Sequence, residues 1–251
     1  MTYPVHEIFR SFQGEGTHAG AAAGFVRLAG CPIGCPWCDS ADTWNAAAPK
    51  LGRLTPAQIL AALDTTTAGA AGGQGSSRVG GVHAATAGAA TAGLTAAPPS
   101  RVIITGGEPA IHDLAPLCDA LRARGTAVHL ETCGAFPLRG AFDWITVSPK
   151  WRALPLAETL ARANELKLII TAPDEIRRWF DHLATTISPF PIPHFPFPNP
   201  PNPFPISAIY LHPEWSRRAD PVLLAAIADW VSAAGDPWRA GWQIHKNYNA
   251  R

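Results

Sequence analysis

This sequence of 251 residues has almost no net charge and no apolar run near its first residues. Its 20 Lys and Arg nearly balance its 19 Asp and Glu, which leaves a formal net charge of +1. No overall field therefore favours a nucleic acid or an anionic membrane surface. Residues 1–10 include Pro4, Glu7 and Arg10 and lack the apolar stretch of a signal peptide or membrane span. We expect a cytoplasmic protein that binds neither nucleic acid nor membrane.

Cysteine is also scarce, and the few that are present are unevenly placed. There are five, an odd number that does not suit a disulfide framework. Cys31, Cys35 and Cys38 lie close together, as metal ligands in a reducing compartment do. Cys118 and Cys133 lie apart from them, and we interpret Cys133 as a small buried residue and not as a further ligand.

Large apolar side chains are sparse in two segments. Residues 68–99 are almost wholly Ala, Gly, Thr and Ser, which offer too little apolar area to offset the entropy of ordering. Residues 189–205 have proline at nearly every second place, which favours an extended backbone. We interpret both as insertions into one domain that covers residues 1–251. The second is expected to be a stiff linker, with an arm that recognises a partner as the alternative.

The rest of the chain alternates short apolar runs with helical segments, which predicts an α/β fold with a largely parallel sheet. About six strands would form a partial, incomplete β/α barrel. The expected strands are residues 24–28, 101–105, 127–132, 143–148, 166–171 and 208–212. The expected helices start at Thr55-Pro56 and Asp220-Pro221 or cover 115–124 and 174–183. Functional residues should gather at the carboxyl ends of the strands.

The three clustered cysteines follow the expected strand 24–28 and so belong to a loop at its carboxyl end. Thiolates at this spacing can bind three irons of a cubane and leave the fourth iron open for chemistry. A structural zinc ion would need a fourth Cys or His nearby. The next candidates, His83 and His112, lie far along the chain. The pattern favours a [4Fe–4S] cluster over zinc.

At this point the sequence resembles the radical S-adenosylmethionine superfamily. Its signature is a Cys-x3-Cys-x2-Cys loop with an aromatic residue before the last cysteine, here Trp37. Its second mark is a Gly-Gly-Glu-Pro stretch after the second strand, here Gly106 to Pro109. Glycines let backbone carbonyls approach the ammonium group of a ligand, and Glu108 can add charge. The resemblance implies S-adenosylmethionine as cofactor.

Further stretches resemble the 7-carboxy-7-deazaguanine synthase family. They are residues 7–16, 39–44, 130–134, 148–150 and 243–246. The family's reaction converts 6-carboxy-5,6,7,8-tetrahydropterin to 7-carboxy-7-deazaguanine, with loss of ammonia, on the way to queuosine and related deazapurines. The resemblance therefore implies a carbon–nitrogen lyase with a small pterin substrate. It also implies a homodimer and an electron donor such as flavodoxin.

The resemblance implies a role for each matching residue. The cluster would be bound by Cys31, Cys35 and Cys38, and Mg²⁺ by Ser40. S-adenosylmethionine would be contacted by Trp37, Asp39, Gly106, Gly107, Glu108, Glu131, Ser148, Pro149, Lys150 and His212, the last at a position where relatives often have glutamine. The substrate would be contacted by Phe12, Gln13, Gly14, Glu15, Arg27, Thr105, Gln243 and His245.

Arg27 separates this family from the wider superfamily. An arginine in an apolar strand is ordinarily a snorkelling or ion-paired residue. The resemblance instead assigns it to the substrate carboxylate, which a planar guanidinium can bind through two donors. Two alternatives stay open. One is a radical enzyme that activates a partner protein docked on residues 189–205, against which Arg27, Ser40 and residues 13–16 argue. The other is a zinc-binding interaction module.

Overall fold

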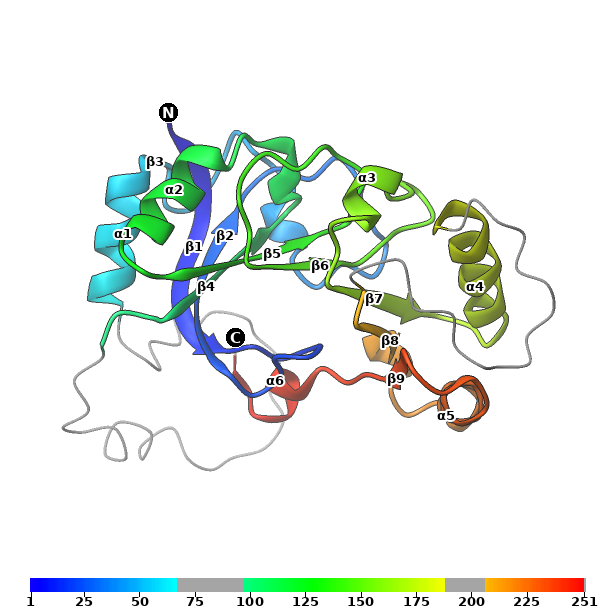
Figure 1. The fold of residues 1–251 in the computed structure, drawn as a ribbon. Coiled ribbons are helices and arrows are strands. Elements are labelled where there is room, and N and C mark those ends of the chain that lie inside the picture. Colours follow the sequence, from blue (N-terminus) through cyan, green and yellow to red (C-terminus); the bar gives the residue numbers. More distant parts are fainter. Residues whose placement is uncertain (67–96, 188–205, 251) are drawn as a thin grey trace, which may run out of the picture.

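One curved sheet runs through the molecule. The computed structural model describes residues 1–66, 97–187 and 206–250. Its strands are β1 (Tyr3–Phe12), β2 (Ala22–Leu28), β3 (Arg53–Leu54), β4 (Arg101–Gly106), β5 (Ala127–Thr132), β6 (Trp144–Val147), β7 (Glu165–Ile170), β8 (Ala208–Pro213) and β9 (Trp238–Ala240). They lie side by side in the order β3-β1-β2-β4-β5-β6-β7-β8-β9, so β3 and β9 are the edges and the barrel is incomplete (Figure 1).

The sheet is parallel from β2 through β4 to β9, and only β1 and β3 are antiparallel to their neighbours. This confirms the predicted α/β class with a largely parallel sheet. All six predicted strands are present, and the described ranges contain three more. The three missed strands are β1, in which Pro4, Glu7 and Arg10 interrupt the apolar pattern, and the short edge strands β3 and β9.

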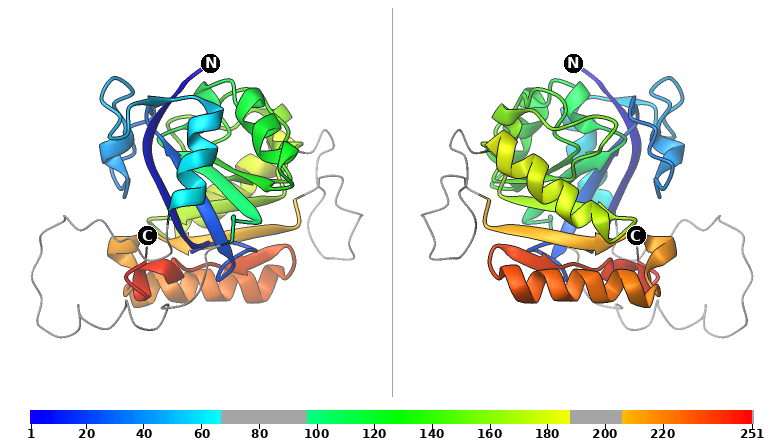
Figure 2. Two further views of the ribbon diagram at one scale, coloured as in Figure 1. Left: turned by 90° about the vertical axis from the view of Figure 1, so that its left-hand side faces the viewer. Right: turned by 90° about the vertical axis from the view of Figure 1, so that its right-hand side faces the viewer.

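The helices cover the outer face of the sheet. They are α1 (Pro56–Thr65), α2 (Ala115–Ala123), α3 (Ala157–Leu160), α4 (Asp174–Ile187), α5 (Pro221–Ala234) and α6 (Ile244–Asn247). The first five lie on the outside of the curve, whereas α6 lies beside the loop that joins β1 to β2 (Figures 1 and 2). No helix in the described ranges is long and apolar enough to cross a membrane.

Two helix starts confirm the prediction from capping residues. At α1 the Thr55 hydroxyl accepts the Gln58 amide, and the Gln58 side chain accepts the Thr55 amide, which forms a capping box. At α5 the Asp220 carboxylate accepts the amides of Val222 and Leu223. Both helices then continue from a proline at the first helical position, where no amide donor is needed.

Side chains along each strand point alternately to the core on the outer face and to the site on the inner face of the sheet. In β4, Val102 and Ile104 are fully buried against the helices, in a core that includes Leu63 of α1 and Leu117 of α2. Because successive strand residues point to opposite faces, Thr105 points to the concave face. The inner face of the sheet is therefore free to carry polar groups.

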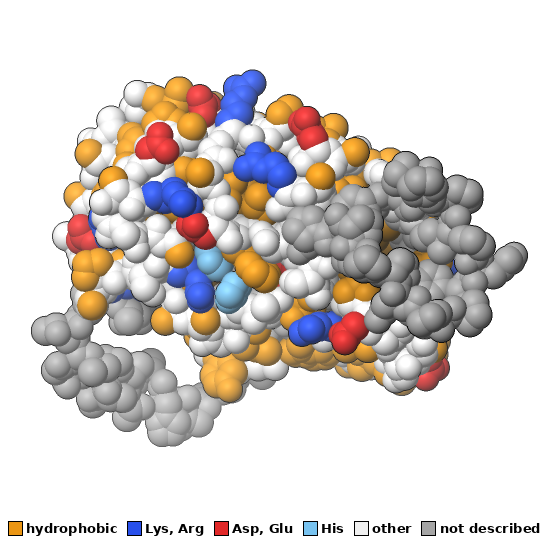
Figure 3. All heavy atoms as spheres, in the orientation of Figure 1, with side chains coloured by type: hydrophobic (Ala, Val, Ile, Leu, Met, Phe, Trp, Pro, Cys, Tyr) orange, Lys and Arg blue, Asp and Glu red, His pale blue; other side chains and the backbone are white. Residues whose placement is uncertain are grey.

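The predicted insertions, 68–99 and 189–205, lie outside the described residues except for 97–99. On the described part of the face in Figure 3, basic and acidic side chains are intermingled, as the near-zero net charge leads one to expect.

Candidate active site

A pocket opens at the carboxyl ends of the parallel strands, where the sequence predicted the functional residues. Its wall includes residues from the cysteine loop, the ends of β4, β5, β7 and β8, and α6. The predicted site residues that line it are Glu15, Cys31, Cys35, Trp37, Cys38, Asp39, Ser40, Thr105, Gly106, Gly107, Glu108, Glu131, Ser148, Lys150 and Gln243. Segments far apart in the sequence thus converge on one cavity.

The cysteine loop is held in place by backbone contacts. The amides of Gly30 and Cys31 donate to the carbonyls of Thr43 and Trp44, and the Glu108 amide donates to the Gly30 carbonyl at 2.7 Å. A Cβ on Gly107 would lie 2.3 Å from the Gly30 carbonyl oxygen. This glycine therefore lets two loops pack closely, a reason that the sequence did not indicate.

The three thiols fit an iron–sulfur cluster better than a single metal ion. All three are free and partly exposed on the pocket wall. Among the described residues, no three Cys, His, Asp or Glu side chains converge to hold one ion. The thiolates around a cubane each bind a different iron, so they need not converge. A closed structural zinc site requires such convergence.

The carboxylate of Glu108 accepts hydrogen bonds from neighbouring parts of the protein. Its side chain is buried, and its two oxygens accept the Ala110 amide at 2.9 Å, the Thr132 hydroxyl at 2.6 Å and the Cys133 amide at 2.7 Å. The carboxylate thus ties the turn after β4 to the end of β5. Cys133 is buried as expected, and burial is the main reason that its thiol pKa is raised.

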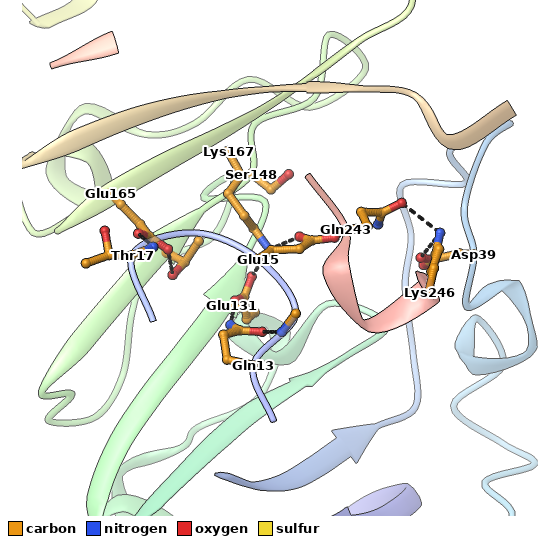
Figure 4. Close-up of polar contacts among 12 residues, drawn as sticks. Gln13, Glu15, Thr17, Asp39, Glu131, Ser148, Glu165, Lys167, Gln243 and Lys246 are labelled. Atoms are coloured by element: carbon orange, nitrogen blue, oxygen red, sulfur yellow. Dashed lines mark hydrogen bonds and ion pairs between the residues drawn. The ribbon is translucent and has the colours of Figure 1, made fainter. Parts of the chain in front are cut away.

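An ion cluster lies on the inner face of the sheet (Figure 4). The Lys167 ammonium is 2.6 Å from one carboxylate oxygen of Glu15 and 2.6 Å from one of Glu131. Gln13 donates to the other oxygen of Glu131 at 2.7 Å, and Gln243 donates to the other oxygen of Glu15. Two carboxylates and one ammonium therefore share a site that is largely closed to solvent.

The shared ammonium sets the charge of the two carboxylates. Burial by itself would raise the pKa of Glu15, but Lys167 holds that pKa far below its usual range. Burial also raises the pKa of Glu131, and the neighbouring Glu15 charge adds to this effect. Burial opposes the charge of Lys167, but Glu131 and Glu15 together keep its pKa well above the usual value. The pKa of Glu15 is therefore lowered and that of Glu131 raised, although both carboxylates contact the same ammonium.

The stretch 148–150 contacts the cysteine loop. Lys150 donates to the Ser148 hydroxyl at 2.6 Å, and its ammonium lies 5.0 Å from the centre of the Trp37 ring. Burial is the main cause that lowers the pKa of Lys150. Pro149 does not form part of the pocket wall.

Other predicted residues surround the pocket without lining it: Phe12, Gln13, Gly14, Arg27, His212 and His245. Arg27 is about a quarter exposed, 3.5 Å from the Glu7 carboxylate, and its guanidinium lies over the Phe9 ring. Phe12 packs edge-on against the Tyr248 ring, and His245 packs on Gly14 in the loop that joins β1 to β2.

His212 is completely buried below the pocket. A Cβ on Gly241 would lie 2.3 Å from its Nε2 atom, and neither ring nitrogen has a hydrogen-bond partner among the described residues. Burial lowers its pKa to about 4. The position predicted to contact the cofactor is therefore covered by protein in this structure.

Sequence reasoning missed two lysines of the site. Lys167 lies on β7 and Lys246 on α6, and both line the pocket. A lysine in the otherwise apolar run of β7 was a signal of the same kind as Arg27. Lys246 belongs to the matching stretch 243–246, but no role follows for it from the sequence.

The fold and the site together define a radical S-adenosylmethionine enzyme, because an incomplete parallel barrel carries three cysteines after β2 and Gly-Gly-Glu-Pro after β4. No family model matches the chain. It is 37% identical to the 7-carboxy-7-deazaguanine synthase of Synechocystis sp. over 100% of this chain and 95% of that protein. It is 32% identical to the synthase of Flavobacterium psychrophilum over 98% of this chain and 91% of that protein.

A solved structure agrees with these relatives. The crystal structure of QueE from Escherichia coli superposes with a TM-score of 0.66 and 28% identity, over 98% of this chain and 95% of that one. The chain belongs to the 7-carboxy-7-deazaguanine synthase family. This membership confirms the predicted class, a radical enzyme with a [4Fe–4S] cluster and S-adenosylmethionine, and excludes the zinc-binding module and the activating enzyme.

Proposed function

We propose that this chain converts 6-carboxy-5,6,7,8-tetrahydropterin to 7-carboxy-7-deazaguanine with loss of ammonia. The observation that carries the proposal is that one pocket holds both the three-cysteine loop and the cluster of Glu15, Glu131 and Lys167. Carboxylates and amides at this position suit the several N–H groups along the edge of a pterin. The names of the relatives support the same reaction.

The substrate would lie between the inner face of the sheet and the cysteine loop. Glu15 would accept N–H groups of the pterin, and Glu131 would contact S-adenosylmethionine on the other side of Lys167. Gln13 and Gln243 hold these two carboxylates in place. Thr105 also lines the pocket and would contact the substrate. Arg27 would bind the substrate carboxylate through its exposed edge. Phe12, Gly14 and His245 would shape the rim around this site.

The cofactors would occupy the opposite side of the pocket. A [4Fe–4S] cluster on Cys31, Cys35 and Cys38, together with S-adenosylmethionine, supplies the carbon radical that the reaction needs. Besides Glu108, the predicted contacts to S-adenosylmethionine that line the pocket are Trp37, Asp39, Gly106, Gly107, Glu131, Ser148 and Lys150. The Glu108 side chain would act by holding this loop in shape, because its oxygens are taken by β5 and the turn.

Ser40 would contribute an oxygen to Mg²⁺, an ion that prefers oxygen ligands and retains waters. Its hydroxyl lines the pocket and lies 3.8 Å from the Cys38 sulfur. The ion would then lie beside the cysteine loop, where it could neutralise the substrate carboxylate. His212 and Pro149 are not part of this proposal, because neither lines the pocket.

The proposal also covers the domain organisation, the location and the partners of the enzyme. We retain a single domain over residues 1–251, supported by one sheet that extends from Tyr3 to Ala240. Free thiols throughout support a cytoplasmic location. On the family resemblance, the proposal also includes a homodimer and an electron donor such as flavodoxin.

An anaerobic turnover assay tests the function. The reconstituted protein is mixed with 6-carboxytetrahydropterin, S-adenosylmethionine, Mg²⁺ and dithionite, and the product is identified by mass spectrometry. We expect 7-carboxy-7-deazaguanine without any protein partner. Protein with a full complement of about four irons per chain that forms no product would reject the proposed reaction.

A further inference from the structure

The segment 243–250 is docked against the loop that joins β1 to β2 (Figure 1). The Ile244 amide donates to the Gly14 carbonyl at 3.0 Å. The His245 ring packs so closely on Gly14 that a Cβ there would lie 1.9 Å from Nδ1. These contacts place α6 over the pocket beside Glu15, although the two segments lie at opposite ends of the sequence.

Lys246 joins the two sides of this pocket (Figure 4). Its ammonium donates to the Gln243 side-chain oxygen at 2.8 Å and lies 3.2 Å from the Asp39 carboxylate. It also lies 4.7 Å from the centre of the Trp215 ring. The side chain is only 20% exposed. Lys246 therefore contacts Asp39, next to the cysteine loop, on one side. On the other side it contacts Gln243, which donates to Glu15.

The direction of the Gln243 amide depends on both neighbours. An amide group has one acceptor end and one donor end of nearly the same shape. Lys246 offers only donors and takes the oxygen of Gln243, so the NH₂ group is left to face the Glu15 carboxylate. Without Lys246 the Gln243 oxygen would lose its donor, and the amide would be held only on the Glu15 side.

We propose that Lys246 is a positioning residue of this active site. It orients Gln243 towards Glu15 and holds Asp39, so that the substrate side and the cysteine loop keep a constant separation. This inference rests on the proposed function, because it assumes that Glu15 and Asp39 contact substrate and cofactor respectively.

A matched lysine controls for the general effect of removing a surface ion pair. Lys50 lies 2.7 Å from the Asp42 carboxylate, but its side chain is 63% exposed and it does not line the pocket. Exposed ion pairs of this kind contribute little to the free energy of unfolding. Lys50→Met is therefore the control for Lys246→Met, and Lys246→Arg tests rescue by a residue that keeps the charge and several donors.

The first measurement is hydrogen–deuterium exchange of the protein without its cluster. In Lys246→Met the peptide that covers residues 243–250 should exchange faster, because its anchor to Asp39 is lost, and Lys50→Met should leave this peptide unchanged. The second measurement is turnover of the reconstituted enzyme. Lys246→Met should lower kcat/KM for the pterin by about ten- to a hundredfold, mostly through KM, with unchanged iron content. Lys246→Arg should recover most of this loss.

A double-mutant cycle shows whether Lys246 acts through Gln243. If it does, Lys246→Met should add little to the defect of Gln243→Leu, so the two effects should be strongly non-additive. Additive effects, or exchange and turnover like those of Lys50→Met, would overturn the proposal. If Lys246→Met does not fold, the comparison of Lys246→Arg with Lys246→Gln carries the same test. Failure of the proposed function is distinguishable, since the wild-type enzyme would then form no product while the exchange result would still hold.

Discussion

At the scale of single residues, Lys167 has a strong electrostatic effect in the pocket. It is the cation between Glu15 and Glu131, and all three side chains are at most 15% exposed. Removing one partner of a buried ion pair is much more costly than the net value of the pair, because the remaining charges lose their compensation. The Lys167 contact therefore governs both stability and the position of the two carboxylates.

We predict that Lys167→Met destabilises the protein by about 3–5 kcal/mol and abolishes turnover. The expected cause is repulsion between Glu15 and Glu131, which forces one of them to bind a proton. Urea unfolding followed by circular dichroism measures the first effect. The double variant Lys167→Met with Glu131→Gln should recover part of the stability. If it recovers none, the loss of packing and not of charge is responsible.

Arg27 contacts Glu7 in the structure and is proposed to bind the substrate carboxylate. We predict that Arg27→Lys lowers kcat/KM for 6-carboxytetrahydropterin by about ten- to a few hundredfold, because the planar pair of donors is lost. Arg27→Ala should lower it further. Uncoupled cleavage of S-adenosylmethionine should persist in both variants, since it requires only the cysteine loop and its neighbours.

Glu7→Gln is the control for this prediction. It weakens the contact of 3.5 Å between Glu7 and Arg27 but leaves the guanidinium in place. If Arg27 binds substrate, Glu7→Gln should have a much smaller effect than Arg27→Ala. Equal effects of the two variants would show that Arg27 acts by supporting the strand.

At the scale of elements, the loop between β1 and β2 is inserted into the open barrel. The Thr17 amide donates to Glu165 at 2.8 Å, and the Thr146 hydroxyl donates to the other oxygen of Glu165 at 2.9 Å. Gly16 has a φ of +69°, and a Cβ there would lie 2.2 Å from the Glu165 carboxylate. The loop thus positions Glu15 by packing its neighbour against β7.

Two glycines of this loop allow a matched test. Gly16 and Gly20 both have positive φ, but a Cβ on Gly20 would meet no atom within 4 Å. Both alanine variants therefore share the backbone strain of about 1–2 kcal/mol. We predict that only Gly16→Ala displaces Glu15, so pterin turnover should fall at least tenfold more than in Gly20→Ala. Similar kinetics in the two variants would contradict this.

The elements that were predicted correctly have strong local signals. The six predicted strands correspond to β2 and β4 through β8, with ends that differ by no more than two residues. The helices that begin at Pro56 and Pro221 were marked by a capping residue followed by proline. By contrast, β1 was missed, because its neighbours β2 and β3 stabilise a strand whose own pattern is irregular.

At the scale of the whole molecule, buried histidines link stability to pH. Burial lowers the pKa of His129 to about 4, and Arg101 and His18 act in the same direction. The pKa of His212 is lowered to about 4, again chiefly by burial. In the unfolded chain a histidine has a pKa of about 6.5. The unfolded state therefore binds more protons between about pH 6.5 and about pH 4, and the folded state loses stability as pH falls through that window.

We predict a decrease in the free energy of unfolding between pH 7 and pH 5. The raised pKa of Glu131 acts in the opposite direction, so a variant is needed to isolate the histidine contribution. His129 packs beside the rings of His18 and Trp144, and His129→Phe keeps a ring but cannot bind a proton. Urea unfolding at both pH values should show a smaller decrease in this variant than in wild type. An equal decrease would mean that His129 does not contribute.

The sequence by itself determined the class of chemistry. The cysteine spacing and the Gly-Gly-Glu-Pro stretch are local patterns, because a single short loop must supply all three ligands and one turn must pack on it. Binary patterning likewise determined the parallel sheet, since alternating apolar strands and helices have few other ways to bury their faces. Arg27 and Gln243 were identified by family resemblance and not by physical reasoning.

Only the tertiary structure decided how the pocket is charged. Lys167 contacts Glu15 across 152 residues of sequence, and Gln243 contacts Glu15 across 228. Such pairs depend on strand register and on how the β1–β2 loop enters the barrel, and neither leaves a local pattern. The same holds for His212, which strand β8 and Gly241 bury below the pocket. A motif specifies which groups a loop can offer, whereas packing decides which of them meet and which are covered.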